Sequence, residues 1–134
     1  MALFPRGSAI GFFGMFGRSA DLRQLDDALR AVDVHQRLVP EAVKLAAVRF
    51  LKEAYGPEPH SEAYRRAADL IGYCVIGANA FAGANGEEPT SAVEARIEAA
   101  LSLGDTLDSQ LILLAMHARI IQPSVVDSFG LESA

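Results

Sequence analysis

Apolar residues recur every three or four positions along most of the chain. Such spacing places their side chains on one face of an α-helix and predicts an amphipathic helix. In residues 40–56 this stripe consists of Val43, Ala46, Ala47, Phe50, Leu51 and Ala54. Comparable stripes lie in residues 19–34, 61–77, 89–104 and 106–122, with a short one in residues 123–129. The pattern therefore predicts five main helices and one short helix.

Capping residues and chain breakers stand at the ends of these stripes. Ser19, Ser61 and Asp105 occupy positions where a side-chain oxygen caps a helix N-terminus, and Pro40 suits a first helical turn. The expected helix ends are Gly56, Gly77, Gly104 and Gly130. Residues 78–86 are expected to form one helical turn and a loop. No run alternates convincingly as a strand, so the predicted fold class is all-α, an irregular bundle of five main helices plus short helical turns.

The stretch "LILLAM", residues 111–116, is apolar on every face of its predicted helix. A helix of this kind lies in the middle of a bundle or is shared between the core and a subunit interface. We therefore expect the central apolar helix of the fold near residues 106–121. Whether it lies only in the middle of the bundle or also at a subunit interface stays open. The side chains expected in the core are Phe50, Ile71, Leu111, Leu114 and Ile121.

The length of 134 residues suits a single helical domain, residues 19–134, preceded by an apolar segment, residues 1–18. The formal net charge is −5, and the 12 Lys and Arg residues are scattered, which argues against binding to nucleic acid. Cys74 is the one cysteine, which excludes an internal disulfide and a thiolate zinc cluster and fits a reducing cytoplasm. The longest apolar run is far shorter than the roughly 20 residues that span a bilayer, so no transmembrane segment is expected.

Side chains able to perform chemistry are few and widely spaced. The three histidines have no metal-ligand spacing, so no metal site is expected. Thr106, Gln110 and His117 fall close to one face of their helix, where they are candidates to line a small ligand pocket; for His117 the alternative is a core hydrogen bond. The adjacent Asp26 and Asp27 indicate a solvated helix face. Motifs of serine hydrolases and phosphate-binding loops are absent, and we expect no catalytic residue and no cofactor.

The most distinctive stretch is "AIGFFGMFGR", residues 9–18, in which Phe12, Phe13 and Phe16 stand among three glycines. The glycines interrupt the apolar run and few basic residues flank it, so neither an export signal nor a stable membrane anchor is predicted. Soluble monomers rarely expose such a cluster, and we expect the phenylalanines to cover an apolar groove of this chain or of a second copy. The preceding "LFPRGS" resembles the protease site of expression tags, and Met15 offers an alternative start, so the origin of residues 1–14 stays open.

The stretches "SADLRQLDDALRA" and "QPSVVDSFGLES" resemble small all-helical bacterial proteins that carry only a hypothetical-protein label. Neither stretch is a catalytic motif, so the resemblance assigns no site residue. We expect a non-enzymatic, cytoplasmic helical module that acts through protein–protein contact, with a second copy of itself as the partner. The alternative is a helical bundle that binds a small apolar ligand in its core, with His117 and Gln110 as polar contacts.

Overall fold

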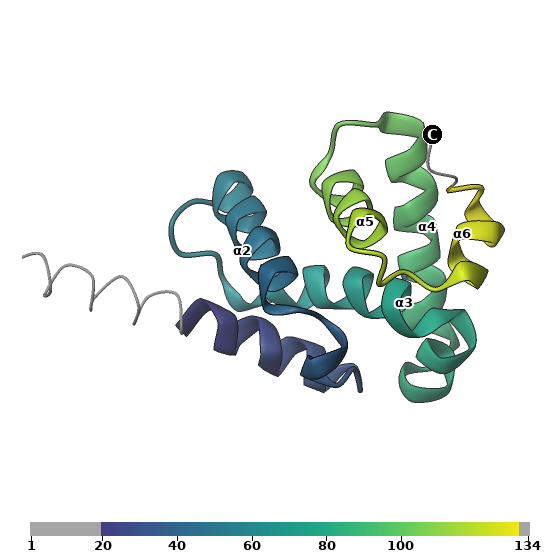
Figure 1. Ribbon diagram of the computed structural model, residues 1–134, viewed down its shortest axis with the longest axis horizontal. Helices are drawn as coiled ribbons and strands as arrows, with labels where there is room; N and C mark the ends of the chain where they lie inside the picture. Colours follow the sequence, from purple (N-terminus) through teal and green to yellow (C-terminus); the bar gives the residue numbers. More distant parts are fainter. Residues whose placement is uncertain (1–19, 132–134) are drawn as a thin grey trace, which may run out of the picture.

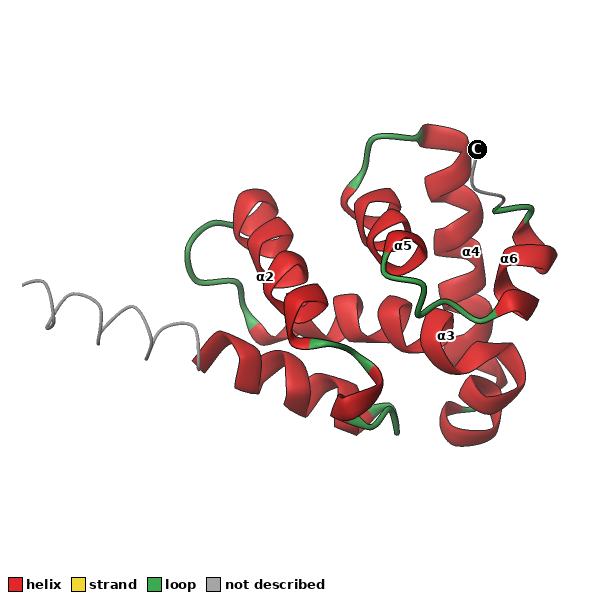
Figure 2. Cartoon of the chain, in the orientation of Figure 1, coloured by secondary structure: helices red, strands yellow, loops and turns green. Residues whose placement is uncertain are grey.

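The computed structural model describes residues 20–131, and every regular element in that range is helical (Figures 1 and 2). The N-terminal helix occupies residues 20–31. It is followed by a short 3-10 helix, η1 (Gln36–Leu38), and by α2 (Glu41–Tyr55), α3 (Ser61–Asn85), α4 (Glu87–Leu103), α5 (Leu107–His117) and α6 (Pro123–Phe129). The described part of the chain contains no strand, which confirms the all-α fold class.

Helix α3 is the centre of the fold, and α2, α4, α5 and α6 all pack against it. Its fully buried side chains include Tyr64, Leu70, Ile71 and Tyr73. Small residues let the neighbouring segments approach closely, because a Cβ atom at Gly72 would stand 2.9 Å from Cγ2 of Val34. Helix α3 is therefore the most enclosed helix, because its small side chains allow the other helices to pack closely around it.

The structure corrects the expected position of the central helix, near residues 106–121. Helix α5 buries one side only, formed by Leu111, Ile112 and Ala115. Leu113 is 50% exposed. The expected core residues that are only partly buried are Phe50, Leu114 and Ile121. High apolar content made this stretch resemble a central helix, but α5 has 11 residues, whereas α3 has 25 and is surrounded by the other helices.

Gly77 interrupts α3 and separates its long first part from residues 78–85. Its φ angle is 88°, in the left-handed region that favours glycine, and the helix kinks there. Gln122 binds the carbonyl groups at this break: its backbone N–H donates to Cys74 O (2.8 Å) and its Nε2 donates to Val75 O (2.9 Å). Residues 78–85, expected as one turn and a loop, instead form a second helical limb.

Two side-chain caps lie one residue away from the positions expected from the sequence. Thr106, not Asp105, caps α5: its hydroxyl accepts from the N–H of Ser109 (3.1 Å), and Ser109 Oγ accepts from the N–H of Thr106 (2.7 Å). His60, not Ser61, caps α3, because its Nδ1 accepts a hydrogen bond from a backbone N–H of the first turn (3.3 Å). A hydroxyl and a ring nitrogen thus satisfy N–H groups that have no partner within the helices.

By length and composition, α3 alone among the described helices is long and apolar enough to cross a membrane. Of its most apolar stretch, 56% is buried inside the fold. This is the position of a core helix in a soluble protein, so the apolar character of α3 is explained by its contacts with the surrounding helices.

Candidate functional site

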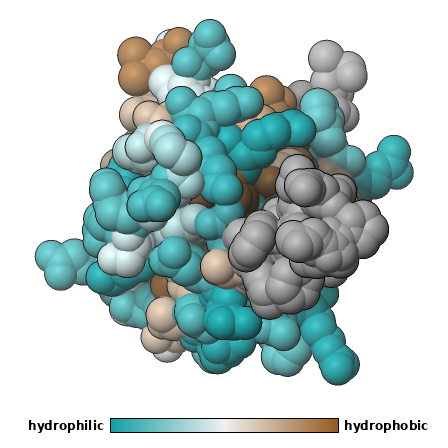
Figure 3. All heavy atoms as spheres, turned by 90° about the vertical axis from the view of Figure 1, so that its left-hand side faces the viewer, coloured by the Kyte–Doolittle hydropathy of each residue, from teal (hydrophilic) through white to brown (hydrophobic). Residues whose placement is uncertain are grey.

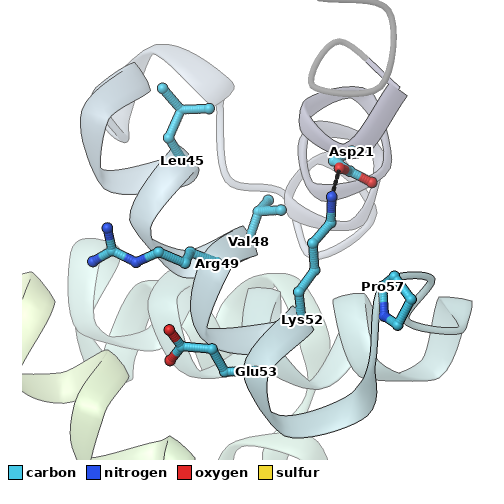
Figure 4. A pocket seen from close by; sticks show the side chains of 7 residues that line it. All are labelled: Asp21, Leu45, Val48, Arg49, Lys52, Glu53 and Pro57. Carbon is cyan, nitrogen blue, oxygen red and sulfur yellow. Dashed lines mark ion pairs between the residues drawn. The ribbon is translucent and has the colours of Figure 1, made fainter. Parts of the chain in front are cut away.

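A groove of about 500 Å³ opens between the N-terminal helix and α2, and we call it the α2 groove (Figure 4). Its lining residues are Asp21, Leu45, Val48, Arg49, Lys52, Glu53 and Pro57. Figure 4 shows Val48 and Lys52 projecting from α2 toward the N-terminal helix, whereas Arg49 and Glu53 project to another side of α2. The groove therefore combines an apolar part, around Leu45 and Val48, with charged groups along its rim.

Two ion pairs hold the N-terminal helix against α2 beside this groove. Lys52 Nζ contacts Asp21, and Lys44 Nζ lies 2.9 Å from Oδ1 of Asp26. The side chain of Lys44 is only 11% exposed, so its ion pair is largely withdrawn from water. The expectation that Asp26 belongs to a solvated face is therefore wrong, because its partner lies 18 residues along the chain on α2.

Helix α3 supplies a further contact at this end of the molecule. The hydroxyl of Tyr64 donates to Oδ1 of Asp21 (3.1 Å), and the same carboxylate pairs with Lys52. Burial, with a smaller contribution from Asp21, raises the pKa of Tyr64 from 10.0 to about 12. The tyrosine therefore stays neutral at ordinary pH and acts as a hydrogen-bond donor that positions Asp21 at the groove.

The charges around the α2 groove cancel. Asp21 and Glu53 are negative, whereas Arg49 and Lys52 are positive. Figure 3 faces this end of the molecule and shows hydrophobic atoms, in brown, between hydrophilic atoms, in teal. A surface with an apolar floor and no net charge suits an apolar, uncharged occupant better than a nucleotide or a metal ion.

A second apolar surface lies where the end of α4 meets α5, away from the α2 groove (Figure 1). It is a hollow of about 290 Å³ lined by Ala100, Leu101, Gly104, Ser109, Ile112, Leu113, Met116, Gly130 and Leu131, and we call it the α4–α5 face. Leu101 and Leu113 are 49% and 50% exposed, and no lining residue is charged. Leu103, in the last turn of α4, is 74% exposed but does not line the hollow.

Three further titratable groups have raised pKa values. Burial, followed by the hydrogen bond that Tyr73 donates to Glu94 (2.8 Å), raises the pKa of Tyr73 well above its ordinary value. Burial raises the pKa of Cys74 to about 12, so the thiol stays protonated and packs as a small apolar group. Burial also raises the pKa of Asp69, against the opposing effect of Arg96 and other arginines. Among the described residues, no three His, Cys, Asp or Glu side chains are grouped to hold a metal ion.

The structure does not bring the three predicted pocket residues together. Thr106 lines a cavity of about 190 Å³ beside the Arg96–Asp108 ion pair, and its hydroxyl takes part in the cap of α5. Gln110 is partly buried and His117 is exposed, and neither lines this cavity, the α2 groove or the α4–α5 face. The length of α5 separates Thr106 from His117 by about 16 Å along the helix axis. The predicted interaction residues Phe12, Phe13 and Phe16 lie outside the described residues.

Sequence reasoning missed the α2 groove for a physical reason, whereas for α5 it left a helix shared with a subunit interface as one of two positions. On α2 it followed one apolar stripe, whose members Val43, Ala47 and Leu51 are buried in the core. Leu45 and Val48 are three residues apart and form a second apolar row on the same helix, which was the available signal. In this row Val48 is itself 5% exposed and belongs to the core, whereas Leu45 is only partly buried. On α5 the sequence is apolar on all faces, but the structure buries only one side of the helix. The apolar residues on the other side are the ones left at least partly exposed.

Comparison of the chain with protein-family models, curated proteins and solved structures finds no match. Of the resemblance noted in the sequence, the structure supports only the small size and the all-helical class. The geometry and charge of the α2 groove and the α4–α5 face are therefore the features of this chain that bear on its function.

Proposed function

We propose that this protein is a non-enzymatic helical module that works in the cytoplasm through protein–protein contact, with a second copy bound at the α4–α5 face. The observation that carries the proposal is the combination of two half-exposed leucines, Leu101 and Leu113, with an apolar hollow of about 290 Å³. Soluble proteins rarely leave a contiguous apolar surface in water, and such surfaces commonly mark sites of protein association.

The α4–α5 face has the features that a two-fold contact needs. In a symmetric dimer the same patch serves both protomers, so a protruding side chain of one copy must meet a hollow of the other. A charged residue near the two-fold axis would meet its own like charge. No residue lining this hollow is charged, although the chain carries a net charge of −5. Two copies that repel each other through their net negative charge are therefore able to meet at the uncharged α4–α5 face.

The energy available from the leucines indicates a weak dimer. Complete burial of a leucine contributes about 1.5–3 kcal/mol, and Leu101 and Leu113 have about half of their surface left to bury. The four leucines of a dimer therefore contribute about 3–6 kcal/mol, which is close to the lower estimates of the cost of association, about 4 kcal/mol. We expect a reversible dimer whose population rises with protein concentration.

The titratable groups support a non-enzymatic role. Tyr64 and Tyr73 donate hydrogen bonds between helices, and Cys74 is kept protonated by burial. Asp69 lines a small cavity of about 160 Å³, but the other three groups do not line it. A catalytic site needs several titratable groups around one cavity. Here the titratable groups with raised pKa values do not share a cavity, and they serve the packing of α3.

Sedimentation velocity at several protein concentrations tests the proposal. The native chain is expected to shift from monomer to dimer as the concentration rises. Leu113→Asp should remain monomeric, because the new charge meets its counterpart across the two-fold contact. Leu103→Asp is the matched control, since Leu103 is exposed in the same region but does not line the hollow, and it should dimerise like the native chain.

The helical circular dichroism spectrum of each variant verifies that it has folded before its mass is compared. A native chain that stays monomeric at every concentration would overturn the proposal. Dimerisation of Leu113→Asp to the same extent as the native chain would overturn it as well.

A further inference from the structure

We infer that the apolar segment of this same chain, residues 10–16, binds in the α2 groove. The segment precedes the described residues, and its apolar members are Ile10, Phe12, Phe13, Met15 and Phe16. The inference is independent of the dimer proposed above, because it concerns another surface and other residues.

The described chain begins beside the groove. Its first helix starts at residue 20, and Asp21, in the first turn, lines the groove. Phe16 precedes Asp21 by five residues, which span at most about 18 Å when fully extended. A segment tethered this closely reaches an effective concentration of about millimolar at the groove, so it is favoured over a free partner of the same chemistry.

The charge and the floor of the groove fit this occupant. Two positive and two negative side chains surround the groove, so it has no net charge with which to select an acidic or a basic partner. Residues 9–17 carry no charge, and their large side chains are apolar, like Leu45 and Val48. A cavity of about 150 Å³ holds one benzene ring, so a groove of about 500 Å³ has room for about three phenyl rings.

A fluorescent reporter in the full chain tests the inference. The protein contains no tryptophan, so Phe16→Trp introduces a single indole. In the groove the indole is shielded from water, and its emission is expected to be blue-shifted relative to the same chain unfolded in urea. Leu45→Asp, added to this variant, places a charge in the groove and should return the emission to the unfolded value. Leu103→Asp, at the α4 end of the molecule, should leave the blue shift unchanged.

A cross-link identifies which chain supplies the segment and does not depend on the stability of the Leu45→Asp variant. In a Cys74→Ala background, Phe16→Cys combined with Leu45→Cys, in the apolar part of the groove, should form a disulfide within one chain. The product is a monomer of altered mobility under non-reducing conditions. Phe16→Cys combined with the exposed Ser102→Cys is the matched control and should remain reduced.

Each remaining outcome overturns the inference in a distinct way. Emission equal to that of the unfolded chain, or equal cross-linking with Ser102→Cys, would show that the segment does not bind in the groove. Disulfide-linked dimers in place of the linked monomer would assign the occupant to a second copy. A blue shift that Leu113→Asp abolishes would place the segment at the α4–α5 face instead.

Discussion

The α2 groove and the α4–α5 face are both apolar hollows, but they differ in what surrounds them. Four of the seven residues that line the groove are charged, whereas none of the nine that line the face is charged. A charged rim keeps its water and confines an apolar occupant to the floor, whereas an uncharged surface lets an identical copy approach without repulsion. Apolar area alone therefore does not define a binding surface, because the neighbouring charges select the kind of occupant.

The two surfaces also differ in how their walls are attached to the core. Helix α5, one wall of the α4–α5 face, is anchored by buried apolar side chains, among them Leu111. The N-terminal helix, one wall of the α2 groove, is anchored by the buried Leu25 and Leu29 and also by the ion pairs that Asp21 and Asp26 make with α2. Substitutions in the two walls should therefore differ in the size and in the physical origin of their effects.

Leu111→Ala is expected to have the largest effect and to lower the free energy of unfolding by about 2–5 kcal/mol, because this side chain is 1% exposed. Leu113→Ala, on the same helix, should lower it by less than about 1 kcal/mol, because half of this side chain is already in water. Urea unfolding at a concentration where the chain is monomeric measures both values. Equal losses would show that the outer side of α5 is not a free surface.

Lys44→Met should lower the free energy of unfolding by about 1–3 kcal/mol. The substitution keeps the packing of the aliphatic chain but leaves the carboxylate of Asp26 without its partner. Arg30→Ala is the matched control, because it removes a pair with Asp27 whose side chains are exposed, and it should change the value by about 0.5 kcal/mol or less. The same loss in both variants would contradict an ionic anchor for the N-terminal helix.

Above about pH 10 the free energy of unfolding should fall, and Tyr64→Phe should reduce this fall. The pKa of Tyr64 is about 12 in the folded chain, whereas the unfolded chain titrates near 10. The contribution of Tyr64 to stability is therefore complete below pH 10 and is lost as the pH rises toward 12, because the unfolded chain releases the proton first. Urea unfolding at about pH 8 and about pH 11 measures the difference, and parallel losses in the two proteins would contradict the assignment.

The smallest expected effect is that of salt, and it distinguishes the two surfaces. At about 0.15 M ionic strength, repulsion beyond about 8 Å is screened, so two copies of net charge −5 should dimerise more tightly than at about 0.01 M. The emission of Phe16→Trp should not change, because residues 9–17 carry no charge. Sedimentation and fluorescence at the two ionic strengths measure these responses. A dimer that weakens in salt would indicate that ion pairs hold the copies together.

The helices were predictable from sequence because each carries an apolar stripe and residues that begin or end it. The bounds of α2, Glu41–Tyr55, agree with the predicted 40–56 to one residue at each end. The stripes do not determine which helix is enclosed. Helix α3 owes its central position to small residues such as Ala68 and Gly72, which allow close neighbours, whereas the more apolar "LILLAM" stretch belongs to a shorter helix.

The candidate site was less predictable, because it depends on contacts between distant parts of the chain. Leu45 and Val48 form a groove only because the N-terminal helix stands beside α2, and a periodic pattern within α2 contains no information about that neighbour. The pairing of Asp26 with Lys44 is non-local in the same sense. The shared helix face of Thr106 and His117 was a valid local argument, but α5 ends at His117 and no described cavity joins the two residues.

Gln122 makes hydrogen bonds across the break at Gly77 in α3. Because Gln122 is synthesised after α3, these hydrogen bonds form only late in the synthesis of the chain. The carbonyl groups of Cys74 and Val75 acquire these partners only after residue 122 has left the ribosome. Until then the kink of α3 depends on water for its hydrogen bonds, and the surface that α5 and α6 cover is exposed. The nascent chain is therefore expected to complete the packing around α3 only after synthesis has passed α6.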